Sequence, residues 1–406
     1  MNDLATRTFR PHASPNAARR AALACMVALA VALGVGRFAF TPLLPLMLHG
    51  GSLDIRHGGW LASLNYTGYF LGAISCVALR MDAARVVKTG LAATVLLVLA
   101  MGVTQQFWVW VVVRFVAGAV SAWTFVFASQ WGLRRLAELG ANEWSGVIYT
   151  GPGFGIAATG LLVSAASGYG ATAGWLGFGL VSAVLTALVW RTFEPLSTVR
   201  ASAGNPTQQA HAQPHPIHLH RADAFWLIVL YGVPGFGYII TATFLPVIAR
   251  AALPVGSSWP DLFWPMFGLA LVVGALVGAR LPSYWDNRTL LAGCYVLQAL
   301  GIIAGIVWPT AGGFALGSAL IGLPFTAITL FAMREARRLH GDNAAGLMGY
   351  ATAAYGLGQI AGPLVAAPIA AHNGSFTPAL WLAALALIAG AVGLVAVTMR
   401  RPVARV

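Results

Sequence analysis

Twelve long apolar stretches, separated by short polar connections, divide this chain of 406 residues. A helix needs about 20 apolar residues to cross the hydrocarbon core of a bilayer, and every stretch is close to that length or above it. The sequence therefore predicts an all-α membrane protein with twelve transmembrane helices. The predicted spans are 22–48, 58–80, 86–104, 106–130, 145–168, 171–193, 222–249, 259–281, 288–308, 311–333, 344–371 and 375–399.

The composition agrees with a membrane environment. Hydrophobic residues make up 58% of the chain and charged residues 9%, which is outside the range of soluble globular proteins. The net charge of +13 would suit nucleic acid, but the basic residues are spread over the connections instead of forming one patch. We expect a lipid bilayer around the chain and no nucleic-acid partner. Cys25, Cys76 and Cys294 fall in apolar stretches without a CxxC pair, so we expect no disulfide, metal or cofactor.

Arginine and lysine residues predict the orientation. Of the 24 basic residues, twenty fall in the two tails and one set of connections, and only Arg56 and Arg250 fall in the other set. Because basic connections stay in the cytoplasm, both termini are predicted to be cytoplasmic. The polar start of the chain leads into an apolar run that is too long for a secretory signal, which predicts an uncleaved tail.

The apolar stretches form two groups of six. Residues 194–221 between them are rich in Pro, Ser, Gln and His and lack apolar periodicity, which predicts a cytoplasmic linker. The predicted parts are a tail at 1–21, a six-helix bundle at 22–193, the linker at 194–221, a second bundle at 222–399 and a tail at 400–406. The linker histidines, His211, His215, His218 and His220, are interpreted as solvated, since no Cys or carboxylate completes a metal site.

The two groups repeat each other weakly. Three residues of the first stretch recur in the seventh at equal spacing: Gly34, Gly36 and Pro45, and Gly235, Gly237 and Pro246. In that register Tyr238 takes the place of Arg37, and a Gly-Pro dipeptide recurs at 151–152 and 362–363. Repeated halves joined by a linker are typical of transporters that rock around a central site, so two pseudo-symmetric bundles are predicted.

Two arginines lie inside apolar stretches, Arg37 in the first and Arg114 in the fourth. A guanidinium stays protonated and costs roughly 2.5 to 3.5 kcal/mol at the centre of a membrane helix. The first span is predicted to run outward and the fourth inward, which places both arginines at about the same depth. All eleven acidic residues fall in tails, connections or span edges, so none is expected at that depth.

We therefore hypothesise that the counter-charge for the arginine pair is the substrate, a small organic anion held by bidentate contacts. The alternative is a structural role for each arginine. Its guanidinium would then bond to backbone carbonyls at the broken helix near Pro42 and Pro45, or stack on an aromatic ring.

Helical spacing extends this surface to further polar and aromatic side chains. The candidate substrate-binding residues are Arg37, Thr41, Asn65, Tyr69, Arg114, Ser121, Phe125, Tyr149, Tyr231, Tyr238, Thr241, Tyr355 and Gln359. Interhelical hydrogen bonding without any ligand is the alternative for the members other than the arginines. The candidate gating residues, which soften or bend helices, are Pro42, Pro45, Gly151, Pro152, Gly362 and Pro363.

Several motifs resemble the major facilitator superfamily, and together they cover essentially the whole chain. RFVAGAVSA at 114–122 resembles its fourth-helix RxxxG motif, and YTGPGFG at 149–155 resembles its fifth-helix GP motif, which is commoner in antiporters. The stretches at 34–45, 59–69 and 231–246 are similar to a bacterial branch of that superfamily. The connection at 80–88 lacks the usual glycines of the superfamily's loop signature.

This resemblance implies a central cavity lined by helices one, four, seven and ten, and a multi-pass protein of a bacterial inner (plasma) membrane. We expect a monomeric secondary active transporter that moves a small organic anion by alternating access. The alternative is proton-antiport efflux of neutral or amphipathic compounds. His49, His57 and His372, or a weakly acidic substrate, are possible carriers of co-transported protons. No HExxH motif or Ser/His/Asp set supports an enzyme, and a sensor or scaffold is a further alternative.

Overall fold

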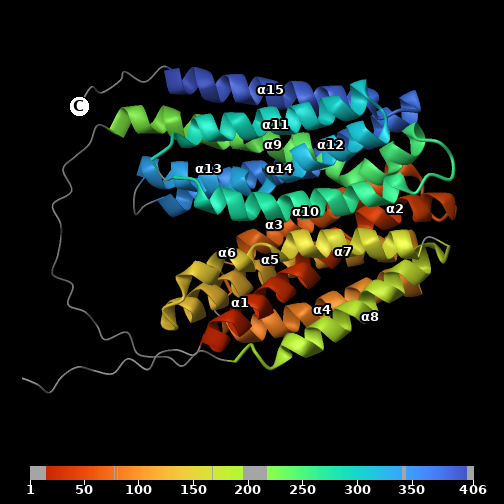
Figure 1. Cartoon of the computed structure of the whole chain (residues 1–406), viewed down its shortest axis with the longest axis horizontal. Coiled ribbons are helices and arrows are strands. Elements are labelled where there is room, and N and C mark those ends of the chain that lie inside the picture. Colours follow the sequence, from red (N-terminus) through yellow and green to blue (C-terminus); the bar gives the residue numbers. More distant parts are fainter. Residues whose placement is uncertain are drawn as a thin grey trace, which may run out of the picture.

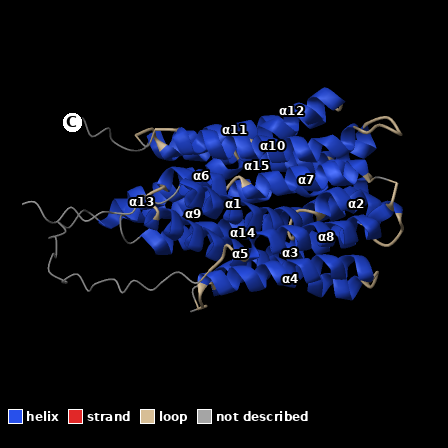
Figure 2. Ribbon diagram, turned by 60° about the horizontal axis from the view of Figure 1, so that its bottom comes forward, coloured by secondary structure: helices blue, strands red, loops and turns tan. Residues whose placement is uncertain are grey.

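The computed structural model describes residues 15–76, 78–79, 81–166, 168–194, 217–282, 284–340 and 344–399. These residues are helical, without a strand, and their long helices run side by side (Figures 1 and 2). Both predicted tails lie largely outside the described residues, as does most of the predicted linker. The side chains of His211, His215, His218 and His220 lie outside them too.

The helices build twelve passes, as the sequence predicts. In chain order they are α1 (Pro15–Leu29), η1 (Ala30–Val35), α2 (Phe40–His49), α3 (Ile55–Ser75), α4 (Ala83–Val103), α5 (Phe107–Glu138), η2 (Asn142–Trp144), α6 (Ser145–Ile148), α7 (Gly151–Ala165), α8 (Gly170–Trp190), α9 (Ile217–Ala252), α10 (Trp259–Arg280), α11 (Asn287–Val307), α12 (Ala311–Gly322), α13 (Phe325–His340), α14 (Ala344–Asn373) and α15 (Thr377–Met399). The first, fifth and tenth passes are each built from more than one helix.

Eleven of these passes are long and apolar enough, within the described residues, to cross a membrane. The exception is α3, the predicted second span, which is 21 residues long but carries many polar side chains. It packs against α5 on one side and α14 on the other, so much of its surface contacts protein instead of lipid. Its polarity is therefore compatible with a transmembrane position.

Two helices extend well beyond the predicted spans. The fourth and tenth predicted spans end at 130 and 333, whereas α5 continues to Glu138 and α13 to His340. These extra turns contain Leu, Arg, Ala and Glu, which favour helix. The hydrophobic window marks where a helix leaves the bilayer, and these two helices continue beyond that point.

The first and last described residues, Pro15 at the start of α1 and Met399 at the end of α15, lie at one face of the molecule (Figure 1). We call this the terminal face, where α1 begins and α8 and α15 end, and we call the opposite face, where α2 ends and α3 begins, the distal face. In Figure 1 the helices of the N-terminal half, α1 to α8, lie below those of the C-terminal half, α9 to α15. The halves meet through α2 on α9, α3 on α14 and α7 on α10.

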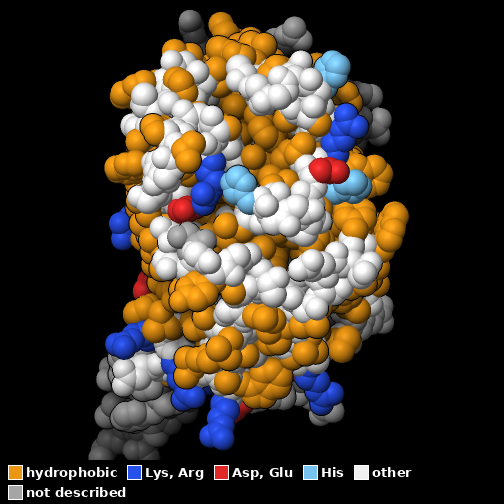
Figure 3. Space-filling model, turned by 90° about the vertical axis from the view of Figure 1, so that its right-hand side faces the viewer, with side chains coloured by type: hydrophobic (Ala, Val, Ile, Leu, Met, Phe, Trp, Pro, Cys, Tyr) orange, Lys and Arg blue, Asp and Glu red, His pale blue; other side chains and the backbone are white. Residues whose placement is uncertain are grey.

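The distal face carries few charged groups (Figure 3). Its two predicted arginines are Arg56, in the first turn of α3, and Arg250, which pairs with Asp261 of α10. Nearby, Asp54 caps α3 by accepting from the backbone N–H of His57, and its second oxygen lies 2.6 Å from the His57 ring. Most of this face is therefore uncharged.

A buried charge cluster lies at the terminal end of the C-terminal half. Glu335 of α13 has no exposed surface and accepts from Arg288 of α11 at 2.7 Å and from Arg338 at 2.7 Å. Arg288, 3% exposed, also lies 3.2 Å from Asp223 of α9. The cluster ties three helices together. The sequence placed Glu335 in a connection, and its burial follows from the added turns of α13.

The helices α3 and α5 cross in close contact at two glycines. A Cβ atom at Gly118 would lie 2.0 Å from the carbonyl oxygen of Asn65, and one at Gly68 would lie 1.9 Å from that of Phe115. Distances this short exclude any side chain. The glycine of the RxxxG motif therefore serves helix packing, and Arg114, one turn before it, lies on the same face of α5.

We expect Gly118→Ala to destabilise the protein by about 1 to 3 kcal/mol, because the new methyl group pushes α3 away from α5. Gly177→Ala on α8 is the matched control, since a Cβ there meets nothing within 4 Å. The measurement is the thermal unfolding of both purified variants in one detergent. Equal stability of the two variants would contradict the packing role of Gly118.

Candidate functional site

The first pass loses its regular helix just before Arg37. After α1 the chain forms the π-helix η1 and then the turn 36–39, in which the N–H groups of Arg37 and Phe38 both bond to the carbonyl of Leu33, at 3.2 and 3.0 Å. Gly34 crosses Gly155 of α7 so closely that a Cβ would lie 2.4 Å from its Cα. Irregular turns of this kind inside helices occur often at functional sites. Here the turn places the side chain of Arg37 between the two halves.

The guanidinium of Arg37 is surrounded by aromatic rings. Its central carbon lies 3.9 Å from the ring centroid of Tyr69 and 5.1 Å from that of Tyr66, and the residue is 5% exposed. One Nη donates to Oε1 of Gln359 in the other half at 2.9 Å. The Nε atom is buried and has no hydrogen-bond partner among the described residues.

The Gln359 side chain continues this contact into the C-terminal half. Its amide nitrogen donates to the hydroxyl of Tyr238 on α9. The Tyr238 ring stacks on Tyr355 with centroids 6.0 Å apart, and Tyr355 stacks on Tyr231 at 5.0 Å. Arg37 of the first half thus contacts, through Gln359, a row of stacked tyrosines in the second half.

Arg114 lies beside Arg37 but has different partners. Its two Nη atoms lie 3.3 and 3.4 Å from the carbonyl oxygen of Arg37, and its Nε donates to the carbonyl of Leu61 at 3.4 Å. Its guanidinium also lies over the ring of Phe40, 4.7 Å from the centroid. The predicted equal depth of the two arginines is confirmed. Arg114 supplies donors to the irregular turn that carries Arg37.

No carboxylate among the described residues forms an ion pair with either arginine. Two permanent cations in the interior of the molecule are therefore without an acidic partner in the described part of the chain. Aromatic faces and backbone carbonyls offset part of the cost of burying them.

The site is closed toward the distal face. Three further hydrogen bonds join the halves on that side of Arg37. They are Thr41 Oγ1 to the Ala242 carbonyl at 3.1 Å, Ser63 Oγ to the Ile360 carbonyl at 2.9 Å, and Tyr66 Oη with Thr243 Oγ1 at 3.0 Å. Toward the terminal face, about one turn from the buried Tyr66 and Gln359, Tyr69 and Tyr355 are only half-buried. Hydrogen bonds between the halves therefore close the distal side of Arg37, whereas residues on its terminal side are partly exposed.

The predicted site residues divide into three groups. Tyr69 and Gln359 contact Arg37 directly, and Thr41 lies one turn further along the same pass. Tyr238, Tyr355 and Tyr231 form the stacked row behind Gln359. Asn65 and Ser121 bind backbone carbonyls, of Arg114 at 2.9 Å and of Gly118 at 2.7 Å. Phe125 and Tyr149 contact each other edge to face at 6.3 Å, nearer the terminal face, and Thr241 lines a small pocket inside the C-terminal half.

Sequence reasoning missed three aromatic contacts of the arginines. Tyr66 precedes Tyr69 by three residues, a spacing that puts both on one face of α3 and that was available as a signal. Phe38 lies in the turn and Phe40 begins α2 directly after it, where no helical periodicity applies. The immediate partners of Arg37 come from the second and eleventh passes, whereas the resemblance implied that the first, fourth, seventh and tenth line the cavity.

The predicted gating residues lie at helix breaks and crossings. The fifth pass breaks at Tyr149 and Thr150, and Gly151 and Pro152 then start α7. The second pair, 362–363, lies where α14 crosses α3, and a Cβ on Gly59 would approach the Pro363 carbonyl oxygen to 2.9 Å. Pro42 and Pro45 are buried in α2. Their gating role stays a prediction.

The sequence profile of a protein family described as uncharacterised MFS-type transporter YbfB matches residues 29–395. The chain belongs to this family. The match covers both halves and includes the turn at Arg37 and the pair Gln359 and Tyr238. The chain is therefore a multi-pass membrane transporter of the MFS type and not an enzyme, and its substrate is a small molecule.

Two solved structures of the nucleoside transporter NupG share the fold of this family member. A mutant form superposes with a TM-score of 0.73 at 15% identity, over 93% of this chain and 99% of that chain. The other gives 0.68 at 12% identity, over 95% and 100%. No curated protein sequence matches the chain. At these identities the likeness establishes the MFS fold alone.

Proposed function

We propose that this transporter moves a small organic anion by alternating access and that Arg37 binds the anionic group. The observation that carries the proposal is the state of the Arg37 side chain. It is 5% exposed, lies between the two halves and has no carboxylate partner among the described residues. Its Nε donor is also unpaired. A carboxylate or phosphate of the substrate would supply both the missing charge and the missing acceptor.

Arg114 has a different role in this proposal. Its guanidinium contacts the carbonyls of Arg37 and Leu61, so its donors are used within the protein. We assign it the positioning of the irregular turn and assign Arg37 the direct contact with the substrate. The positive charge of Arg114 still attracts an anion, because it lies at the same depth in an environment of low dielectric.

The hydrogen bond between Arg37 and Gln359 gives a route from binding to movement. A substrate anion competes with the neutral Gln359 oxygen for the guanidinium, and charge-assisted hydrogen bonds are about twice as strong as neutral ones. Loss of this bond removes one link between the halves, beside the links made by Thr41, Ser63 and Tyr66. Opening at the distal face requires these links to break.

The alternative is proton-antiport efflux of neutral or amphipathic compounds. The stacked rings of Tyr231, Tyr355 and Tyr238 favour it, because aromatic faces bind flat, uncharged molecules well. The two similar structures belong to a nucleoside transporter, and a nucleoside is a neutral compound with a flat base. A nucleoside is therefore included among the test compounds.

The orientation and the moving parts belong to the same proposal. We assign the terminal face to the cytoplasm of a bacterial inner membrane, which puts both termini inside. Basic residues at the described helix ends of that face support this: Arg19, Arg20, Arg85, Lys88, Arg134, Arg135, Arg191, Arg280, Arg288, Arg334, Arg337 and Arg338. The bundles 22–193 and 222–399 move as two bodies of one monomer, joined by the linker 194–221. A weakly acidic substrate carries any co-transported proton.

The test is a ligand screen on the purified full-length protein. We expect organic acids to raise the unfolding temperature and to drive counterflow in proteoliposomes, whereas matched amides and nucleosides do neither, because only a ligand of the folded state stabilises it. Stabilisation and counterflow by neutral compounds alone would contradict the anion proposal and favour the alternative.

A further inference from the structure

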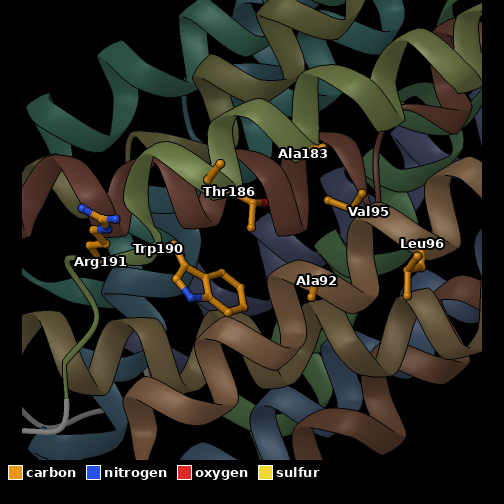
Figure 4. A pocket seen from close by; sticks show the side chains of 8 residues that line it. Ala92, Val95, Leu96, Ala183, Thr186, Trp190 and Arg191 are labelled. Atoms are coloured by element: carbon orange, nitrogen blue, oxygen red, sulfur yellow. The ribbon is translucent and has the colours of Figure 1, made fainter.

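A groove runs between α4 and α8 on the outer surface of the N-terminal half (Figure 4). It has a volume of about 520 Å³ and is lined by Ala92, Val95, Leu96, Ala183, Thr186, Ala187, Trp190 and Arg191. Figure 4 shows Trp190 and Arg191 at one end and Val95, Leu96 and Ala183 at the other. Leu96 and the neighbouring Leu188 are exposed at 67% and 73%, so this surface faces the bilayer.

The end of the groove at the terminal face is basic. Arg191 lines it, and the Nζ atom of Lys88 lies 5.6 Å from the ring centroid of Trp190. Of the nearby carboxylates, Asp82 caps α4 by accepting from the backbone N–H of Arg85, and Glu194 is exposed. Among the described residues neither forms an ion pair with Lys88 or Arg191. The positive charge at this end is therefore uncompensated.

A buried hydroxyl without a partner lies between the basic and apolar ends. Thr186 is 6% exposed, lines the groove, and its Oγ1 has no hydrogen bond within the described residues. Thr94 and Thr124 show the usual solution, a bond to the carbonyl one turn earlier at 2.8 and 2.9 Å. The Oγ1 itself is covered by protein, so an acceptor in the groove reaches it once the side chain rotates about χ1 and turns the hydroxyl toward the groove.

These three features have the order of the parts of a phospholipid. Thr186 lies five residues before Arg191 on α8, which places it about 7.5 Å from the basic end, toward the middle of the bilayer. The glycerol esters of a phospholipid lie on that same side of its phosphate. The apolar lining continues about 4.5 Å further, to Ala183 on α8 and to Val95 and Leu96 on α4. Trp190 lies at the level where indole rings are enriched, the boundary between headgroups and acyl chains.

We propose that this groove binds one anionic phospholipid from the leaflet at the terminal face. Its phosphate contacts Arg191 and Lys88, an ester oxygen accepts from Thr186, and an acyl chain lies along Val95, Leu96 and Ala183. Basic pockets between membrane helices bind anionic headgroups in this way. The lipid holds α4 against α8 and leaves the substrate site unchanged.

The test titrates the purified full-length protein in detergent with phosphatidylglycerol, phosphatidylcholine or inorganic phosphate and counts bound molecules by native mass spectrometry. We expect phosphatidylglycerol to bind at least about tenfold more tightly than phosphatidylcholine, because two cations face its phosphate without a choline charge. The double variant Lys88→Gln with Arg191→Gln should lose about tenfold of that affinity. Inorganic phosphate should not compete, since it lacks the acyl chain.

The matched control is Arg280→Gln with Arg337→Gln, which removes the same charge from exposed helix ends of the C-terminal half and should leave lipid binding unchanged. Thr186→Val should weaken the binding of both lipids, whereas Thr186→Ser should retain it. Equal losses in the two double variants would overturn the proposal, because binding would then follow net charge alone. The proposal would also be overturned if inorganic phosphate bound as tightly as phosphatidylglycerol, or if the Thr186→Val variant bound both lipids with unchanged affinity.

Discussion

Arg37→Gln is expected to weaken binding of the anionic substrate by about 10- to 100-fold. A hydrogen bond to a charged group contributes about 1.5 to 3 kcal/mol, and the substitution also removes the cation that lies 3.9 Å from the Tyr69 ring centroid. The measurement is transport into proteoliposomes over a range of concentrations of the best ligand from the screen. Because binding is lost, the apparent KM should rise at least as strongly as the maximal rate falls.

Two controls separate this loss from misfolding. Arg37→Lys keeps the positive charge but loses the planar guanidinium, which stacks on aromatic rings and donates hydrogen bonds in two directions. It should therefore retain only part of the affinity for the anionic substrate. Removing a buried cation that lacks a carboxylate partner should not lower the thermal stability of Arg37→Gln. Full anion transport by a stable Arg37→Gln protein would contradict the assignment of Arg37 and leave Arg114 as the remaining candidate.

Glu335→Gln is expected to destabilise the C-terminal half by about 3 kcal/mol or more. Glu335 has no exposed surface and is the acceptor for both Arg288 and Arg338, at 2.7 Å each. Removing one partner of a buried ion pair leaves the other charge without full compensation, which costs about 3 to 5 kcal/mol. Asp223, 3.2 Å from Arg288, compensates part of this loss. Thermal unfolding in detergent measures the effect.

Glu138→Gln in the N-terminal half is the matched control. Glu138 occupies a similar place at the end of α5 and also faces two arginines, Arg134 at 3.5 Å and Arg135 at 3.2 Å, but its side chain is 37% exposed. Pairs of this kind contribute at most about 1 kcal/mol. If the two glutamine variants unfold at the same temperature, burial does not distinguish the two sites and the expected difference is wrong.

Most of the fold followed from the sequence because the bilayer limits what an apolar chain can do. Each span must satisfy its backbone hydrogen bonds internally, so length and apolarity locate helices such as α4, α11 and α15 to within about three residues. Helix ends outside the bilayer are not limited in this way. For that reason α5 and α13 extend past their predicted ends, and the burial of Glu335 was not foreseen.

The candidate site was predicted in part. Helical spacing brought Tyr231 and Tyr238 onto one stripe of α9 and paired Tyr355 with Gln359 on α14. Spacing says nothing about which helix lies opposite, so the contact of Arg37 with Gln359 and the stacking on Tyr69 came only from the structure. The same limit explains why Phe125, which shares the Arg114 face of α5, contacts Tyr149 and lies apart from Arg37.

The sequence by itself determined the number of spans, the family and the presence of two cations at one depth, since these depend on composition, order and the rise of a helix. Only the tertiary structure decided how the two cations differ. Arg114 bonds to carbonyls of the irregular turn, whereas Arg37 lies between the halves with an unpaired Nε. Hydrogen bonds to backbone carbonyls depend on which turns are irregular and on what packs against them, and those are properties of the packed chain.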